Sequence, residues 1–119
     1  MKSTFIQKTA EYTLELRGES WTQGSRIMGS LKIKPSEQFD ITSAGVSLAH
    51  VNTKKFKAKD SKAFTIIETK MCEEDNTRFQ FQLSKDCPIS EKSASLYIIC
   101  GQKEDYYEGG HIELKVTPH

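Results

Sequence analysis

The chain has 119 residues, of which 17 are basic and 16 acidic, so its formal net charge is +1 at pH 7. This near balance disfavours a nucleic-acid-binding protein, which needs a net basic surface. With 36% hydrophobic and 28% charged residues, the composition predicts a single globular domain over residues 1–119. The first ten residues lack the apolar run of a signal peptide, and three cysteines at irregular spacing are not a secreted disulfide framework. We therefore expect a cytoplasmic protein.

Alternation of apolar and polar residues dominates the chain and predicts strands with one buried face. In chain order, the predicted strands are residues 12–16, 27–33, 44–51, 64–67, 79–83, 96–100 and 112–116. Residues 64–67 and 96–100 are almost continuously apolar, so these two strands are expected to be the more deeply buried. Turn residues separate the runs, and no stretch shows sustained helical spacing of apolar residues. The sequence predicts an all-β, immunoglobulin-like antiparallel β-sandwich of about seven to eight strands.

Two glycines stand out near the start of the second predicted strand. Gly24 lies where the chain must turn, and a residue that is free to take positive φ suits that place. Gly29 has the same parity as Ile27 and Leu31, so it faces the core in the middle of a strand, where glycine weakens pairing. We therefore expect a bulge at Gly29, or the close approach of a large neighbour such as Trp21 or a phenylalanine.

Several segments resemble the amino-terminal domain of arrestins. They are Trp21-Thr-Gln-Gly-Ser-Arg-Ile-Met-Gly-Ser-Leu31, Phe79-Gln-Phe-Gln-Leu-Ser-Lys-Asp-Cys-Pro-Ile-Ser90, Leu96-Tyr-Ile-Ile-Cys100 and Glu113-Leu-Lys-Val-Thr-Pro118. Their order matches the family over roughly residues 12–118, nearest to the bacterial sporulation-control type. The resemblance implies a sandwich of the arrestin amino-terminal type and a non-enzymatic adaptor or scaffold that binds a protein partner.

Two departures limit what the resemblance implies. Gln23 stands where the family often has Pro, which leaves the turn less rigid. The chain also contains no counterpart of the second sandwich of full-length arrestins, and no motif matches their phosphate-sensing residues. The interdomain machinery and the phosphate sensor of receptor arrestins are therefore not carried over to this chain.

A run of lysines around Phe56 is the first candidate site for a partner. Its members are Lys54, Lys55, Lys57, Lys59 and Lys62. If the segment is extended, Lys55, Lys57 and Lys59 point to one face. Two interpretations stay open: a solvated edge strand, which lysines protect from pairing, or a contact for an acidic or phosphorylated protein segment or an anionic membrane surface.

Tyr106 and Tyr107, between acidic residues and a Gly-Gly pair, are the second candidate contact. Exposed tyrosines bring a large contact area with few rotatable bonds, so they suit recognition, although a plain loop explains the segment as well.

Catalytic, cofactor and metal sites are not expected. The chain has no nucleophile elbow and no metal-binding spacing of cysteines or histidines, and His50 has the parity of a half-buried strand residue. Cys100 is expected to be buried, whereas Cys87, which precedes Pro88 in a loop, is expected to be exposed and mildly activated. The alternatives to an adaptor are thus a small cysteine-dependent enzyme and a self-associating structural protein, the latter a homodimer through an edge strand.

Overall fold

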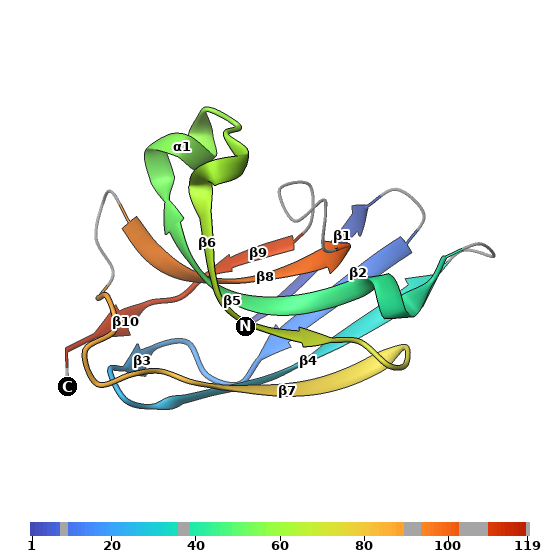
Figure 1. The fold of residues 1–119 in the computed structure, drawn as a ribbon. Helices are drawn as coiled ribbons and strands as arrows, with labels where there is room; N and C mark the ends of the chain where they lie inside the picture. The colour runs from blue at the N-terminus through green and yellow to red at the C-terminus, as the bar shows by residue number, and fades with distance from the viewer. Residues whose placement is uncertain (8–9, 36–38, 90–93, 103–109, 119) are drawn as a thin grey trace.

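The computed structural model describes residues 1–7, 10–35, 39–89, 94–102 and 110–118. Its strands form two four-stranded antiparallel sheets that face each other (Figure 1). One sheet has the order β1 (Lys2–Gln7), β2 (Ala10–Leu16), β4 (Arg26–Pro35) and β7 (Asn76–Gln82). The other has the order β6 (Phe64–Met71), β5 (Ala44–Asn52), β8 (Ala94–Gln102) and β9 (Gly110–Glu113). This arrangement confirms the all-β antiparallel sandwich.

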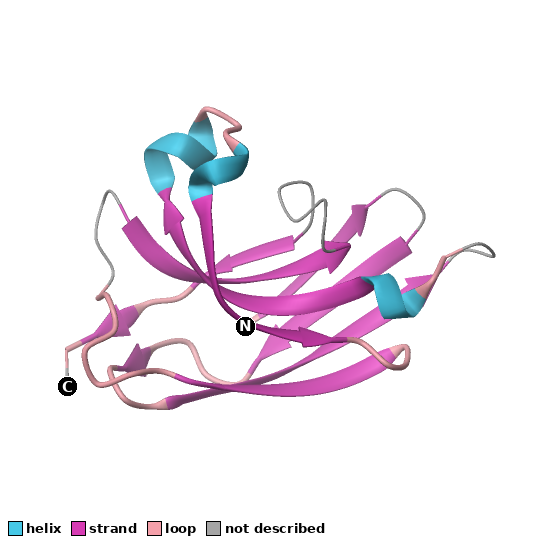
Figure 2. Ribbon diagram, viewed as in Figure 1, coloured by secondary structure: helices cyan, strands magenta, loops and turns pink. Residues whose placement is uncertain are grey.

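Short elements complete the fold. Strands β3 (Trp21–Thr22) and β10 (Val116–Thr117) form a small parallel pair. Helical turns lie at the ends of β5 and β6, as Figure 2 shows: η1 (Ile41–Ser43), α1 (Thr53–Lys57) and η2 (Ser61–Ala63). Each predicted strand falls on an observed one, but the described residues hold ten strands, because β1 and β3 were not predicted and the last predicted strand is divided into β9 and β10. Residues 112–116 do not form one strand: β9 ends at Glu113, and the chain then crosses to pair with β3.

The core lies between the inner faces of the two sheets. On β2, Tyr12, Leu14 and Leu16 are buried, and they belong to the same cluster as Val46 and Leu48 of β5. These residues follow the alternation seen in the sequence, since every second side chain of a strand points to one face. Burial of these apolar side chains is the main stabilising contribution to the sandwich.

Gly29 makes room for the ring of Phe79, which confirms the expected close approach of a large neighbour. Gly29 pairs with Phe79 of β7 on one side and with Leu16 of β2 on the other, without a register shift. A Cβ atom at position 29 would overlap the carbonyl oxygen of Glu15 and lie 2.7 Å from Cζ of Phe79. Gly24 has φ +84°, which confirms the expected turn geometry.

A second glycine, Gly110, makes room for the ring of Phe5 at one side of the sandwich. Phe5 of β1 lies over Gly110 of β9, where a Cβ atom would overlap the ring. The Phe5 ring also stacks on Tyr12, with 5.2 Å between ring centroids. Phe5 therefore joins the two sheets where the edge strands β1 and β9 meet. The sequence did not indicate that Gly110 is needed for this contact.

The upper sheet in Figure 1 is buried on part of its outer face as well. Ala49, Val51 and Ile99 form a second cluster there, separate from the main core. This explains why residues 96–100 are continuously apolar, as predicted for a strand that is covered on both faces. The prediction of deep burial is wrong for residues 64–67, because β6 is an edge strand. Its residues Ile66 and Ile67 are 43% and 55% exposed.

Candidate functional site

The lysine run forms a folded cap on the upper sheet, and the predicted extended conformation is wrong. The side chain of Asn52 accepts a hydrogen bond from the backbone N–H of Lys55 (3.0 Å) and so caps the N-terminus of α1. Asp60 caps η2 in the same way through the N–H of Lys62 (2.8 Å). Lys59, between the two helical turns, has φ 57°. Lys55, Lys57 and Lys59 therefore do not share one face of a strand. We call residues 53–63 the lysine cap.

Phe56 anchors the lysine cap on the outer face of the sheet. Its ring centroid lies 5.4 Å from that of Phe64, 6.0 Å from that of Tyr97 and 5.0 Å from that of His111. Phe64 and His111 are themselves stacked, with 5.5 Å between their centroids. This aromatic group covers the second hydrophobic cluster, so burial of apolar surface holds the cap in place. The role of Phe56 as an anchor, rather than as part of a binding surface, was missed by sequence reasoning.

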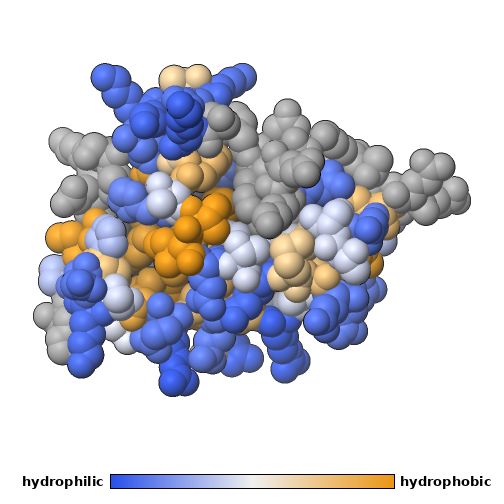
Figure 3. Space-filling model, in the orientation of Figure 1, coloured by the Kyte–Doolittle hydropathy of each residue, from blue (hydrophilic) through white to orange (hydrophobic). Residues whose placement is uncertain are grey.

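The charges of the cap point to solvent. Lys54, Lys55, Lys57, Lys59 and Lys62 are all exposed. In the part of the chain that the structure describes, they form no ion pair with a carboxylate. Figure 3 shows the resulting hydrophilic surface at the top of the molecule, over α1. The structure therefore places the predicted lysines on one projection of the upper sheet. Tyr106 and Tyr107 lie outside the described residues.

The cysteines are free and buried, which corrects the expectation for Cys87. Cys87 is only 7% exposed, because its loop folds back. The backbone N–H of Cys87 donates to the carbonyl of Ser84, and the side-chain amide of Gln23 donates to the carbonyl of Cys87. Burial raises the pKa of the Cys87 thiol above its ordinary value. Burial also raises the pKa values of Cys72 and Cys100, and Cys100 is buried as predicted. A thiolate is the reactive form of cysteine, so these environments disfavour thiol chemistry.

Two kinds of feature are not found in the described ranges. No group of three or more histidine, cysteine, aspartate or glutamate side chains has the arrangement of a metal site. No helix there has the length and apolar character needed to cross a lipid bilayer. His50 is half-buried in β5, as its parity indicated.

The edges of the two sheets differ in how accessible they are. In β6, the pairing with β5 shifts register at Leu48 and Ala49, so Ile67 is an extra, bulged residue. Beyond the bulge, Glu68 and Lys70 share the inner side of the strand and pair with each other (3.2 Å). A bulge and inward charges both discourage the addition of another strand.

Strand β7 has neither of these protections. It pairs with β4 over seven consecutive residues without a shift, and no described strand pairs with its other side. The N–H of Leu83 and the carbonyl of Asp75 bond toward β4, so alternation directs the backbone groups of Arg78 and Gln80 toward the free edge.

Comparison with known proteins gives one structural match. No family model matches the chain, and no curated protein matches it in sequence. The fold is similar to that of the solved structure of Spo0M, a sporulation control protein from Bacillus subtilis, with a TM-score of 0.66 and 16% sequence identity. The match covers 95% of this chain and 51% of that one, so this chain spans about half of its structural neighbour. The arrestin-like fold that the sequence resemblance implied is thereby confirmed.

Proposed function

We propose that this protein is a non-enzymatic adaptor domain that binds an acidic or phosphorylated segment of a protein partner through the lysine cap. The observation that carries the proposal is a set of exposed lysines, without an ion pair among the described residues, on a cap that Phe56 fixes to the sheet. Because Phe56 holds the cap on the sheet before any partner arrives, the backbone of the cap need not be ordered on binding, which lowers the cost of binding. A concentrated positive surface also accelerates association with an acidic partner.

Other observations favour binding over catalysis. The Cys87 thiol, which carried the enzyme alternative, is buried and its pKa is raised. The fold is also similar to that of a sporulation control protein. Free cysteines also support our expectation that the protein acts in the cytoplasm, where thiols stay reduced.

The test is binding of a fluorescent octaglutamate peptide, measured by anisotropy at two salt concentrations. In the cap variant, Lys54, Lys55, Lys57 and Lys59 are changed to Ser. In the control variant, four lysines outside the cap are changed to Ser: Lys2, Lys34, Lys85 and Lys115. Both variants lose the same charge. Four exposed charges worth about 0.5 kcal/mol each predict that the cap variant loses about 30-fold in affinity.

The outcomes separate the alternatives. Equal losses in the two variants would show that only net charge matters and would refute the lysine cap as the site. Phosphatidylserine vesicles are assayed in parallel with the peptide. Binding to the vesicles but not to the peptide, lost only in the cap variant, would identify the cap as a contact for an anionic membrane instead.

A second candidate function is strand addition at β7, either by a partner segment or by a second copy of this chain. The regular, unprotected edge of β7 supports this candidate. The variant Gln80→Pro removes an N–H that faces the free edge, and Gln80→Ala is its control. If β7 mediates a homodimer, sedimentation velocity should show dissociation of the Pro variant alone. A monomer at all concentrations would refute the homodimer.

A further inference from the structure

A hydrophobic patch adjoins the lysine cap on the outer face of the upper sheet. Ile66 pairs with Ala49 of β5, which belongs to the second hydrophobic cluster, so Ile66 lies on the outer face beside that cluster. Phe64, two residues earlier on the same face, contacts Phe56 of the cap. Figure 3 shows a hydrophobic surface over β6, directly below the hydrophilic surface of the cap. The apolar and the basic surfaces are therefore contiguous.

Two adjacent isoleucines, Ile66 and Ile67, are the exposed apolar residues of this surface, and we call them the isoleucine patch. The cap borders the patch on one side, and Glu68 and Lys70 follow it on the other. Isoleucine is among the residue types that are most often buried. An apolar surface with a polar border of this kind is typical of a contact with another macromolecule.

The charges around the isoleucine patch favour an acidic partner. All five lysines of the cap are exposed, and none forms an ion pair with a carboxylate of the described residues. Glu68 and Lys70 pair with each other, so they add no net charge on the other side. A partner that covers the patch thus meets a positive surface toward the cap, and acidic side chains there are complementary to it.

The edge of β6 restricts the conformation of such a partner. The bulge at Ile67 and the inward charges of Glu68 and Lys70 interrupt regular pairing of this edge with another strand. A docked segment therefore has to satisfy its backbone hydrogen bonds internally. An α-helix does so, and its side chains at positions i, i+3 and i+4 can form one apolar face.

The shape of the surface favours a helix over a lipid bilayer. In Figure 1 the cap projects above the upper sheet and β6 leads down from it, so the isoleucine patch lies at the base of the projection. A flat bilayer that rests on the tip of the cap does not reach this base. A helix, about 10 Å across, can lie beside the cap and contact both surfaces.

We propose that the isoleucine patch and the lysine cap together bind an acidic amphipathic helix of a protein partner. Aliphatic side chains of one helix face pack on Ile66 and Ile67, and acidic side chains beside that face meet the lysines of the cap. This inference rests on the proposed function, because the same cap supplies the charges. It adds an apolar contact and the conformation of the bound segment.

The test is fluorescence anisotropy of the full chain with a labelled peptide made of two repeats of Glu-Leu-Ala-Glu-Leu-Leu-Glu, whose leucines form one helical face. A rearranged peptide of the same composition, with its leucines spread around the helix, and octaglutamate are measured in parallel. We expect the amphipathic peptide to bind about 10-fold more tightly than the rearranged one. The variants Ile66→Thr and Ile67→Thr should each weaken its binding about 5-fold, the effect of no longer covering the exposed half of an isoleucine, and leave octaglutamate binding unchanged.

Met71→Thr is the matched control, because Met71 is 42% exposed on the same strand but lies four residues beyond Ile67, about 13 Å along an extended chain. This variant should change the affinity for each peptide by less than a factor of about 2. Equal effects of Met71→Thr and Ile67→Thr, or equal binding of the amphipathic and rearranged peptides, would overturn the inference. Phosphatidylserine vesicles that lose binding in the isoleucine variants, when neither leucine peptide does, would overturn it in favour of a membrane contact.

The failure of this inference is distinguishable from the failure of the proposed function. If octaglutamate binding depends on the lysine cap but Ile66→Thr and Ile67→Thr bind the amphipathic peptide as the wild type does, the isoleucine patch alone is refuted. If the cap variant and its lysine control lose octaglutamate binding equally, the lysine cap is refuted as the site, and the helix site that depends on it is refuted as well.

Discussion

The variant Gly29→Ala tests the central packing argument of the fold. An alanine Cβ at position 29 would overlap the carbonyl oxygen of Glu15 and crowd Phe79 Cζ at 2.7 Å and Leu16 Cδ2 at 3.0 Å. Overpacking a core usually costs about 1–3 kcal/mol. We expect the upper end, about 3 kcal/mol, because the Glu15 oxygen belongs to the backbone and cannot move without disturbing the ladder between β2 and β4.

Urea unfolding measures this loss directly. With a denaturant slope of about 1.5 kcal/mol per M, the midpoint should fall by about 2 M, and the melting temperature by about 10 °C. Met28→Ala, at an exposed position of the same strand, should change stability by less than about 0.5 kcal/mol. A Gly29→Ala variant as stable as Met28→Ala would refute the reasoning. Adding Phe79→Leu to the Gly29→Ala variant should restore only part of the lost stability, since the overlap with the Glu15 carbonyl oxygen remains.

Three further predictions follow from buried or anchoring side chains. Burial raises the pKa of Tyr12 to about 12, so between pH 10 and 12 the unfolded chain binds fewer protons than the folded one. The free energy of unfolding therefore falls over this range, by about 3 kcal/mol in total. Urea unfolding should show that Tyr12→Phe removes this part of the pH dependence; parallel curves for the two proteins would contradict it. Native Cys72, Cys87 and Cys100 should react with a thiol reagent about 100-fold more slowly than in urea, and one fast-reacting thiol would revive the enzyme alternative. Phe56→Ala should cost about 2 kcal/mol and abolish hydrogen-exchange protection in α1, whereas Phe56→Leu should retain most of both; unchanged protection would show that the ring is not the anchor.

The sequence predicted the fold because alternation is a local signal of strand faces. Leu14, Ile27, Val46 and Phe81 were all placed on the core side by parity alone, and all are buried. The burial of β6 was mispredicted because periodicity does not tell which strand lies at the edge of a sheet. Edge position is decided by the order of strands, which depends on contacts between distant segments.

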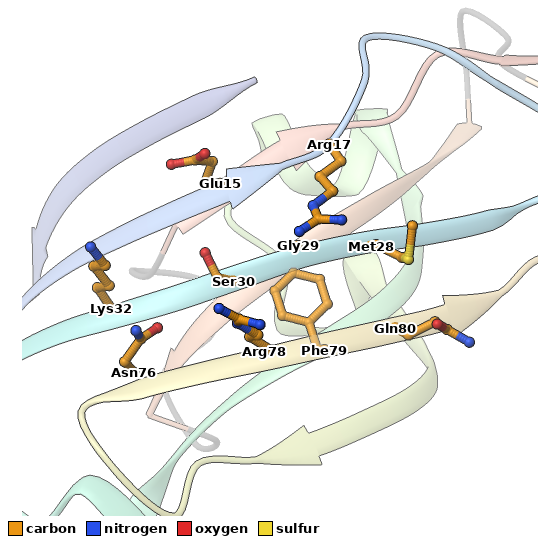
Figure 4. Close-up of a pocket in the computed structure, with 10 residues that line it drawn as sticks. All are labelled: Glu15, Arg17, Met28, Gly29, Ser30, Lys32, Asn76, Arg78, Phe79 and Gln80. Atoms are coloured by element: carbon orange, nitrogen blue, oxygen red, sulfur yellow. The ribbon is translucent and has the colours of Figure 1, made fainter.

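The binding surfaces were less predictable, for related reasons. The lysines were identified, but their helical conformation was not. It depends on capping by Asn52 and on the packing of Phe56 against residues of β8 and β9. An open groove that crosses β2, β4 and β7 around Ser30 (Figure 4) was not identified at all. Arg17 and Arg78 are 61 positions apart, and only the register of β2, β4 and β7 brings them together.

The bulge in β6 also makes one residue dispensable. Deletion of Ile67 would leave every paired residue between β5 and β6 with its present partner, from Val51 and Phe64 to Gly45 and Met71. The folded sheet would thus keep its hydrogen bonds while losing the irregularity that keeps another strand from docking there. A loss of three nucleotides in the coding sequence is therefore expected to leave thermal stability intact while leaving Glu68 and Lys70 as the remaining barrier to pairing at this edge.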